Sequence, residues 1–322
     1  MVDRVLEIKG LKTVFFTDDG QVPAVDGIDL VVQEGEILGI VGESGCGKSV
    51  TSLSVMGLVT DPGKVVEGEI LFNGEEISHA SERRMRKIRG NDIAMIFQEP
   101  MTSLNPVFTI GDQMVEALCI HQKMKKKEAR HRAIDLLKLV GLPRAADLIR
   151  EYPHQLSGGM RQRVMIAMAM ACDPKVLIAD EPTTALDVTI QKQILNLMKK
   201  LNREMGTAIV LITHDLGVVA QMCERVAVMY AGKIVEEGPV RQIFHQAKHP
   251  YTKGLLASLP NLSKRKSRLY SIRGNVPKPG TVKAGCPFAA RCDFVMDRCK
   301  SELPELNRFD DGHSVRCWLH EV

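Results

Sequence analysis

The sequence predicts an α/β fold with a largely parallel sheet, a helical insert and a small cysteine-rich C-terminal extension. Three observations support this prediction. Apolar, β-branched runs alternate with helix-like segments as far as residue 237, which is typical of parallel sheets. Residues 98–172 break this alternation and are mostly helical in pattern, with prolines between the segments. Beyond residue 238 the composition changes, and four of the eight cysteines follow Gly285.

The expected strands are continuous apolar runs, because a strand covered on both faces needs no polar side. They span Val5–Ile8, Ile37–Val41, Ile93–Phe97, Val176–Ala179, Ala208–Thr213 and Arg225–Tyr230. The expected helices span Lys48–Gly57, Ile110–Ile120, Lys127–Val140, Ser157–Ala171 and Thr189–Glu204. We therefore expect an α/β core from residues 1–97 and 173–237, a helical subdomain at 98–172 and an extension at 238–322.

The overall composition excludes several classes of protein. The 322 residues include 43 Lys and Arg against 39 Asp and Glu, and the net charge of +4 is too small to indicate nucleic-acid binding. The longest wholly apolar run, Val164–Cys172, has nine residues, whereas a membrane-spanning helix needs about 20. Charged residues near the N-terminus argue against a signal peptide. We expect a cytoplasmic chain that relies on other subunits for any work at a membrane.

Residues 42–49 (GESGCGKS) form a phosphate-binding pattern, G-x-x-x-x-G-K-S. They follow the expected strand Ile37–Val41 and precede an expected helix, which is the context that this motif requires. The glycines allow successive backbone N–H groups to converge on phosphate oxygens, and the helix N-terminus attracts the same anion. Lys48 would bind the β- and γ-phosphates, and the Ser49 hydroxyl would bind Mg²⁺. The loop by itself indicates a nucleotide but not the reaction.

Two acidic residues follow the strand expected at Val176–Ala179. Asp180 and Glu181 would lie at the edge of the sheet where phosphates bind. Asp180 would hold Mg²⁺, and Glu181 would accept a proton from an attacking water.

Further upstream, residues 156–163 (LSGGMRQR) combine a helix-capping serine with two glycines whose N–H groups can approach an anion.

In combination with the loop, residues 156–163 resemble the signature motif of the ATP-binding cassette (ABC) family. The resemblance extends over about residues 5–237. It implies a P-loop NTPase cassette with a RecA-like core and a helical subdomain. In this family two cassettes pair head to tail, and the signature loop of one closes over ATP bound to the other. Closure is the step that does work, and hydrolysis reopens the pair.

The resemblance also implies the site residues. The catalytic residues would be Glu181 as general base, His214 as switch histidine and Gln98 as Q-loop glutamine. An aromatic residue stacks on adenine in this family, and Phe15 is favoured over Phe16 for that position. The remaining ATP-binding residues would be Gly42, Ser44, Gly45, Cys46, Gly47, Lys48, Ser49 and Val50. Mg²⁺ would be held by Ser49, Gln98 and Asp180. ATP on the partner cassette would meet Ser157, Gly158, Gly159 and Gln162, with Asp187 in the D-loop.

Three further segments resemble the ATP-binding subunits of dipeptide and oligopeptide permeases, in the peptide/nickel branch. They are residues 99–106 (EPMTSLNP), 249–256 (HPYTKGLL) and the tail that begins at 285–288 (GCPF). The resemblance implies two integral membrane permease subunits, a second, paralogous ATP-binding subunit and an extracytoplasmic peptide-binding protein. The chain would lie peripherally on the cytoplasmic face of the cell (inner) membrane and power import of di- or oligopeptides. The same role in an importer of nickel or another solute stays open.

The tail contains four cysteines in the spacing C-x5-C-x6-C-x17-C, namely Cys286, Cys292, Cys299 and Cys317. In a reducing compartment such a cluster indicates a metal site before it indicates disulfides. Four thiolates suit a [4Fe–4S] cluster, which the resemblance also implies. Zn²⁺ and metal-free thiols are the alternatives, since zinc sites more often have closer pairs of ligands. We expect the nearby His313 and His320 to be surface residues.

Two other functions agree less well with the sequence. Soluble ABC proteins that act on DNA or ribosomes usually have two cassettes or a long coiled coil, and this sequence shows one cassette with a short helical insert. A redox sensor with a merely regulatory ATPase is disfavoured by the intact Asp180, Glu181 and His214.

Overall fold

The structure of the chain, a computed structural model, describes residues 3–18, 20–98, 103–184, 186–259 and 270–321. The chain divides into two compact units. Unit 1 comprises residues 1–5, 32–36 and 79–211, and unit 2 comprises 6–31, 37–78 and 212–322. Residues 99–102 of the segment 99–106 lie outside the described residues. Among the described residues we find no helix whose length and hydrophobicity would let it cross a bilayer.

Unit 1 contains three buried strands in the order β8-β7-β6. These are β6 (Ile93–Ile96), β7 (Val176–Asp180) and β8 (Ala208–Ile212). Strands β6 and β7 are parallel, with Ile93 opposite Val176. Every residue of β7 and β8 is buried, as the continuous apolar runs predict. Helix α8 (Val188–Met205) begins after Asp187 and ends at Gly206 in a left-handed conformation.

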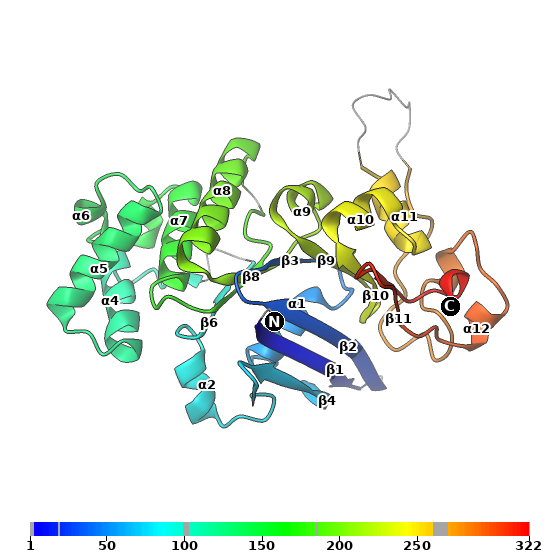
Figure 1. Cartoon of the computed structure of the whole chain (residues 1–322). Coiled ribbons are helices and arrows are strands. Elements are labelled where there is room, and N and C mark those ends of the chain that lie inside the picture. Colours follow the sequence, from blue (N-terminus) through cyan, green and yellow to red (C-terminus); the bar gives the residue numbers. More distant parts are fainter. Residues whose placement is uncertain (1–2, 19, 99–102, 185, 260–269, 322) are drawn as a thin grey trace. The chain divides into compact units, whose positions relative to one another are not determined.

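A group of helices lies between β6 and β7 in the chain. It consists of α4 (Ile110–His121), α5 (Lys126–Leu139), α6 (Ala145–Leu148), the 3₁₀ turn η1 (Pro153–Gln155) and α7 (Gly158–Ala169). Helix α5 contacts α4, α6 and α7 (Figure 1). Before β6 lies the short α2 (Glu82–Ile88), capped by Ser81. The predicted strands and helices of this unit are confirmed, with ends that differ by one or two residues.

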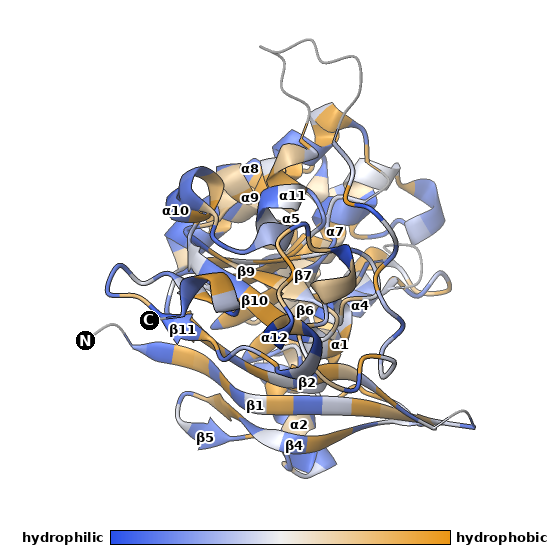
Figure 2. Cartoon of the chain, turned by 90° about the vertical axis from the view of Figure 1, so that its right-hand side faces the viewer, coloured by the Kyte–Doolittle hydropathy of each residue, from blue (hydrophilic) through white to orange (hydrophobic). Residues whose placement is uncertain are grey.

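Unit 2 contains an antiparallel sheet with the order β2-β1-β4-β5, of which the sequence analysis predicted only Val5–Ile8, a part of β1. Its strands are β1 (Arg4–Thr17), β2 (Gly20–Gln33), β4 (Gly63–Phe72) and β5 (Glu75–Glu76). Figure 2 shows hydrophobic and hydrophilic residues alternating along β1. The pattern is hard to read because Pro23 and Gly27 interrupt β2, and the β1–β4 register shifts around Lys12. Gly68 in β4 has φ +96, and a Cβ there would lie 2.6 Å from the Gly10 backbone.

The second sheet of unit 2 has the order β11-β12-β10-β9-β3. Strand β3 (Ile37–Val41) runs parallel to β9 (Arg225–Tyr230), as predicted, and β10 (Lys233–Pro239) runs antiparallel to β9. The helices of this unit are α1 (Lys48–Val55), α9 (Leu216–Met222), α10 (Val240–Gln246), α11 (Pro250–Ala257) and α12 (Arg298–Ser301). Short 3₁₀ turns lie at η2 (Ala289–Arg291) and η3 (Trp318–His320). Tyr230, Tyr251 and Phe288 form an aromatic group in its core, with ring centroids 4.6–5.4 Å apart.

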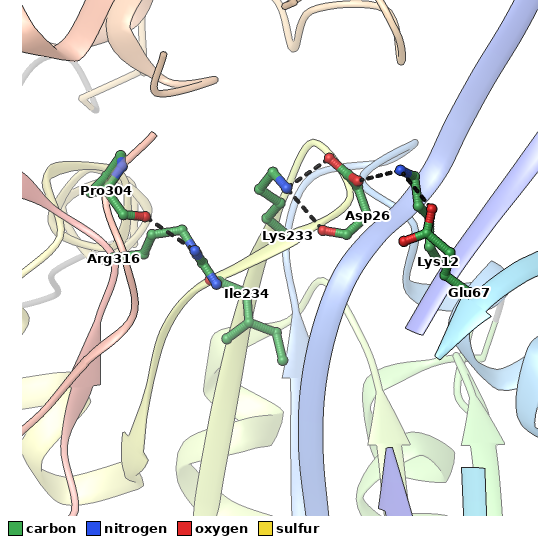
Figure 3. A network of polar contacts seen from close by, with 7 residues as sticks. All are labelled: Lys12, Asp26, Glu67, Lys233, Ile234, Pro304 and Arg316. Atoms are coloured by element: carbon green, nitrogen blue, oxygen red, sulfur yellow. Dashed lines mark hydrogen bonds and ion pairs between the residues drawn. The ribbon is translucent and has the colours of Figure 1, made fainter. Parts of the chain in front are cut away.

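Polar contacts attach the N-terminal strands and the C-terminal tail to β10 (Figure 3). The Asp26 carboxylate lies 2.7 Å from Nζ of Lys233 and 3.8 Å from Nζ of Lys12. Arg316 donates a hydrogen bond from Nε to the carbonyl oxygen of Ile234 at 3.1 Å. The segment that contains the cysteines therefore packs within the same unit as the phosphate-binding loop.

The tail also places a histidine in the interior. Strand β12 (Ser314–Val315) pairs with β10, and β11 (Asn307–Arg308) pairs with β12. This pairing brings His313, which is 1% exposed, within 2.7 Å of the fully buried Glu236 carboxylate. The expectation that His313 is a surface residue is therefore wrong. Burial alone would raise the pKa of Glu236, but hydrogen bonds from His313 and from the Lys248 backbone N–H hold it below its usual value.

Candidate nucleotide-binding and catalytic site

The phosphate-binding loop joins β3 to α1 in unit 2. Gly45 and Gly47 have φ values of +78 and +103, which favour glycine. A Cβ on Gly47 would lie 2.3 Å from the carbonyl oxygen of Ala24, so a side chain does not fit there. A Cβ on Gly45 would meet no described atom within 4 Å. The loop thus packs closely on one side and has open space on the other, as a phosphate cradle requires.

Lys48 lies at the start of α1 and is 6% exposed. Its Nζ donates hydrogen bonds to the carbonyl oxygens of Gly42 at 2.8 Å and Glu43 at 3.1 Å. Burial raises the pKa of the neighbouring Cys46 thiol, although Lys48 partly offsets this effect. The ammonium group is therefore held against the loop, where phosphate oxygens can take over its carbonyl contacts. Ser44 is exposed, and Ser49 and Val50 are half-buried.

Two residues predicted to act at the γ-phosphate lie together in unit 1. Nε2 of Gln98 donates to Oε2 of Glu181 at 3.2 Å, although they are 83 residues apart. The Thr184 hydroxyl donates to the same oxygen at 2.9 Å. Glu181 has φ +47, an uncommon value for a non-glycine residue, which turns the chain directly after β7. The preceding Asp180 is 4% exposed.

The oxygen donors predicted for Mg²⁺ agree with the preference of that ion. Ser49 offers a hydroxyl, Gln98 an amide oxygen and Asp180 a carboxylate. Hard oxygen donors of this kind, completed by water and phosphate oxygens, are the usual environment of Mg²⁺. The donor chemistry therefore fits the ion.

His214 lies between β8 and α9 and is exposed. The next residue, Asp215, caps α9 by accepting hydrogen bonds from the backbone N–H groups of Gly217 and Val218 at 2.8 and 3.2 Å. The N–H of Asp215 in turn donates to the Thr213 hydroxyl at 3.0 Å. The buried strand and the capped helix thus fix the turn that presents His214.

The two aromatic candidates for adenine differ in their surroundings. Phe15 is half-buried, and its ring covers Gly63, where an added Cβ would lie 2.7 Å from Cε1 of the ring. Phe16 is 43% exposed. The two residues alternate along β1, so one ring packs on β4 and the other faces solvent.

The signature segment begins α7 in unit 1. The Ser157 hydroxyl accepts from the N–H of Met160 at 3.3 Å and caps the helix. Gly158 has open space around its Cβ position, and a Cβ on Gly159 would lie 3.0 Å from Ile190. Gln162 is 1% exposed, and its amide atoms have no hydrogen-bond partner within the described residues. The D-loop residue Asp187 accepts from the N–H of Ile190 at 2.9 Å.

Comparisons with known proteins agree with this arrangement. Residues 25–184 match the family described as ABC transporter, and residues 235–299 match the oligopeptide/dipeptide transporter, C-terminal region. The chain is 54% identical to the oligopeptide transport ATP-binding protein AppD of Bacillus subtilis (strain 168), over 98% of this chain and 97% of AppD. It is 50% identical to the dipeptide transport ATP-binding protein DppD of Escherichia coli (strain K12), over 97% of this chain and 96% of DppD.

The chain belongs to the ABC transporter family. Its fold is also similar to a dimeric ATP-binding cassette, MJ0796, solved in a post-hydrolysis state with ADP and Pi. That similarity has a TM-score of 0.66 and 32% identity, and it covers 73% of this chain and 99% of that one. The predictions of an ABC ATPase cassette and of a subunit from the peptide permease branch are thus confirmed. Glu43 of the loop, and Tyr251 and Arg291, which contact it, received no role in the sequence analysis, because these contacts join residues more than 200 positions apart.

The four tail cysteines of this ABC chain line one small cavity of about 20 Å³, together with His249 and Trp318. Burial raises the pKa of Cys286 to about 11, and it also raises the pKa values of Cys292 and Cys317. Within the described residues, however, no three His, Cys, Asp or Glu side chains are grouped so that they could hold a metal ion. The four thiols share a cavity but are not grouped as a formed metal site, so the predicted iron–sulfur or zinc centre is not confirmed.

Proposed function

We propose that this chain binds ATP with Mg²⁺ and hydrolyses it to drive the import of di- or oligopeptides. The main observation is that this one chain has both the glycine-lined loop that holds Lys48 and a C-terminal region that matches oligopeptide/dipeptide transporters. The relatives named as peptide transport ATP-binding proteins align over nearly the whole chain. This breadth supports a common role better than a match of the cassette alone would.

The residue roles follow from their chemistry. Lys48 and the N–H groups of the loop bind phosphate oxygens, and an aromatic ring, Phe15 in preference to Phe16, stacks on adenine. Glu181 accepts a proton from the attacking water, Gln98 senses the γ-phosphate, and His214 holds the γ-phosphate and the water network in place. Ser49, Gln98 and Asp180 would hold Mg²⁺. When bound, the ion would neutralise negative charge that develops on the phosphate oxygens.

The work of transport would come from pairing of two cassettes. Ser157, Gly158 and Gly159 would contact the γ-phosphate on the other cassette, with Gln162 and Asp187 as supporting residues of that interface. We propose a paralogous ATP-binding subunit as the other cassette, two membrane permease subunits and an extracytoplasmic peptide-binding protein. The chain would then be peripheral on the cytoplasmic face of the membrane. We further propose that the chain is divided into an ATP-binding core at 1–97 and 173–237, a helical subdomain at 98–172 and a C-terminal extension at 238–322.

The experiment that tests this function is purification of the tagged chain from its native membranes in mild detergent. Two permease subunits, a second cassette and a peptide-binding protein should accompany it, and ATP-dependent uptake of labelled peptide should follow in reconstituted vesicles. Uptake of nickel but not peptide would assign the chain to the alternative substrate of the branch. A set of soluble partners at every ATP concentration would contradict the transport function.

We also propose that the four-cysteine cavity holds a structural metal centre, an iron–sulfur cluster in preference to Zn²⁺. The support is that all four thiols line one cavity and that four thiolates suit either metal. The cavity would have to widen to admit a cluster. Iron, sulfide and zinc analysis of anaerobically purified chain tests the idea, and metal-free protein with four titratable thiols would contradict it.

A further inference from the structure

The C-terminal extension contacts the phosphate-binding loop through one arginine. Nη1 of Arg291 lies 2.7 Å from Oε2 of Glu43, and Nη2 lies 3.1 Å from Oε1, so the pair is bidentate. Glu43 is the second residue of the loop, and 248 residues separate the partners. The Arg291 side chain is only 5% exposed, whereas that of Glu43 is 32% exposed.

The arginine is held firmly in this position. Its Nε donates to the carbonyl oxygen of Arg273 at 2.9 Å, and Nη1 also approaches the Tyr230 hydroxyl at 3.3 Å. Its guanidinium carbon lies 5.9 Å from the centre of the Phe288 ring. The carboxylate partner raises the pKa of Arg291 above its ordinary value, so the guanidinium stays charged. These contacts make Arg291 a pre-positioned cation that meets the loop from the extension.

A second contact from the extension fixes the backbone of the same loop residue. The N–H of Glu43 donates to the Tyr251 hydroxyl at 2.9 Å. The carbonyl oxygen of Glu43 accepts from Nζ of Lys48 at 3.1 Å. Glu43 therefore has its N–H directed to Tyr251, its carbonyl to the phosphate-binding lysine and its carboxylate to Arg291.

A carboxylate at this position would weaken the binding of an anionic ligand such as ATP. Without Arg291 the Glu43 side chain would be a free negative charge on the residue whose carbonyl already touches Lys48. It would compete with phosphate oxygens for the Lys48 ammonium group, and it would repel them directly. The bidentate pair cancels that charge and holds the carboxylate on the arginine.

We propose that Arg291 is a positioning residue for the ATP site, which acts through Glu43. It keeps the Glu43 carboxylate away from Lys48, so the C-terminal extension sets the affinity of the phosphate-binding loop for ATP. The inference rests on the proposed ATP binding and adds a residue to it from outside the cassette motifs.

The test measures binding of a non-hydrolysable ATP analogue to the purified full-length chain. Arg291→Ala should raise the dissociation constant about tenfold, in proportion to the loss of a charge-assisted pair. Adding Glu43→Gln to Arg291→Ala should restore the affinity to within about threefold of wild type, because the unpaired carboxylate is then gone. A residue needed only for folding would give no such restoration.

Arg298→Ala is the matched control, because Arg298 pairs with Glu302 and Glu321 inside the extension. It should leave the affinity unchanged. Arg291→Lys provides the comparison if Arg291→Ala folds poorly; it keeps the positive charge but loses the bidentate geometry, so it should weaken binding by less than Arg291→Ala does. Wild-type affinity in Arg291→Ala, an equal loss in Arg298→Ala, or no restoration by Glu43→Gln would each overturn the inference. Failure of the wild-type chain to bind the analogue would instead contradict the proposed function.

Discussion

Gln98 donates a hydrogen bond from Nε2 to Oε2 of Glu181 at 3.2 Å, which links the end of β6 to the residue that follows β7. The same carboxylate oxygen accepts from Thr184 at 2.9 Å. The two hydrogen bonds hold the Glu181 carboxylate in one orientation at the turn after β7. This fixed orientation suits the general base proposed for Glu181.

Replacement of this carboxylate should separate ATP binding from hydrolysis. Glu181→Gln keeps the shape and hydrogen-bonding capacity of the side chain but cannot accept a proton, so turnover should fall at least ~100-fold. ATP binding should persist, and paired cassettes should stay closed with ATP. Steady-state ATPase assays and size measurements with ATP check both results. Glu204→Gln, in an exposed pair with Lys200, is the control, and normal hydrolysis by Glu181→Gln would refute the assignment.

The sequence could predict the strands that are buried on both faces, because a run such as Val176–Ala179 has no polar residue to confuse the pattern. It could also predict the phosphate-binding loop and the acidic residues after β7, because each of these features is encoded by residues that are adjacent in the sequence. It could not predict most of the antiparallel sheet, in which Pro23 and Gly68 interrupt the alternation. The pair between Glu43 and Arg291 was beyond prediction too, since a contact across 248 residues leaves no local signal.

The signature segment should be required for pairing but not for ATP binding by the isolated chain. Ser157→Arg puts a long cation where Ser157 caps α7, so it should block closure on the other cassette while leaving analogue affinity within about twofold. Ser157→Ala removes only the cap, at a cost of about 1 kcal/mol in stability. Binding to the single chain and ATPase activity of the assembled transporter distinguish these effects. Loss of binding by the isolated Ser157→Arg chain would contradict the role of this segment.

Two glycines of the loop should respond differently to the same substitution. Gly47→Ala combines a left-handed backbone with a Cβ 2.3 Å from the Ala24 carbonyl oxygen, so it should lower the unfolding free energy by about 2 kcal/mol or more. Gly45→Ala incurs only the backbone strain, about 1 kcal/mol, because open space surrounds its Cβ. Its methyl group would instead enter the space proposed for phosphate and weaken ATP binding. Denaturant unfolding and analogue binding measure the two effects, and equal unfolding losses would contradict the packing argument.

The buried imidazole of His249 should make the chain less stable in acid. Burial lowers its pKa from 6.5 to about 4, and Nδ1 accepts a hydrogen bond from the Tyr251 N–H at 3.0 Å, so the folded state favours the neutral ring. The Glu236 carboxylate opposes this shift, while His320 and Lys253 reinforce it. Because the folded pKa is the lower one, the stabilisation is complete above pH 6.5 and is lost as pH falls towards 4. The loss should reach about 3 kcal/mol at 1.36 kcal/mol per pKa unit.

His249→Asn keeps a helix-capping side chain without a titrating ring, so its unfolding free energy should fall less over this range. The remaining fall belongs to Glu236, whose lowered pKa acts in the same direction. Denaturant unfolding from pH 7 to 4 measures both proteins, and parallel curves would show that His249 does not carry the dependence.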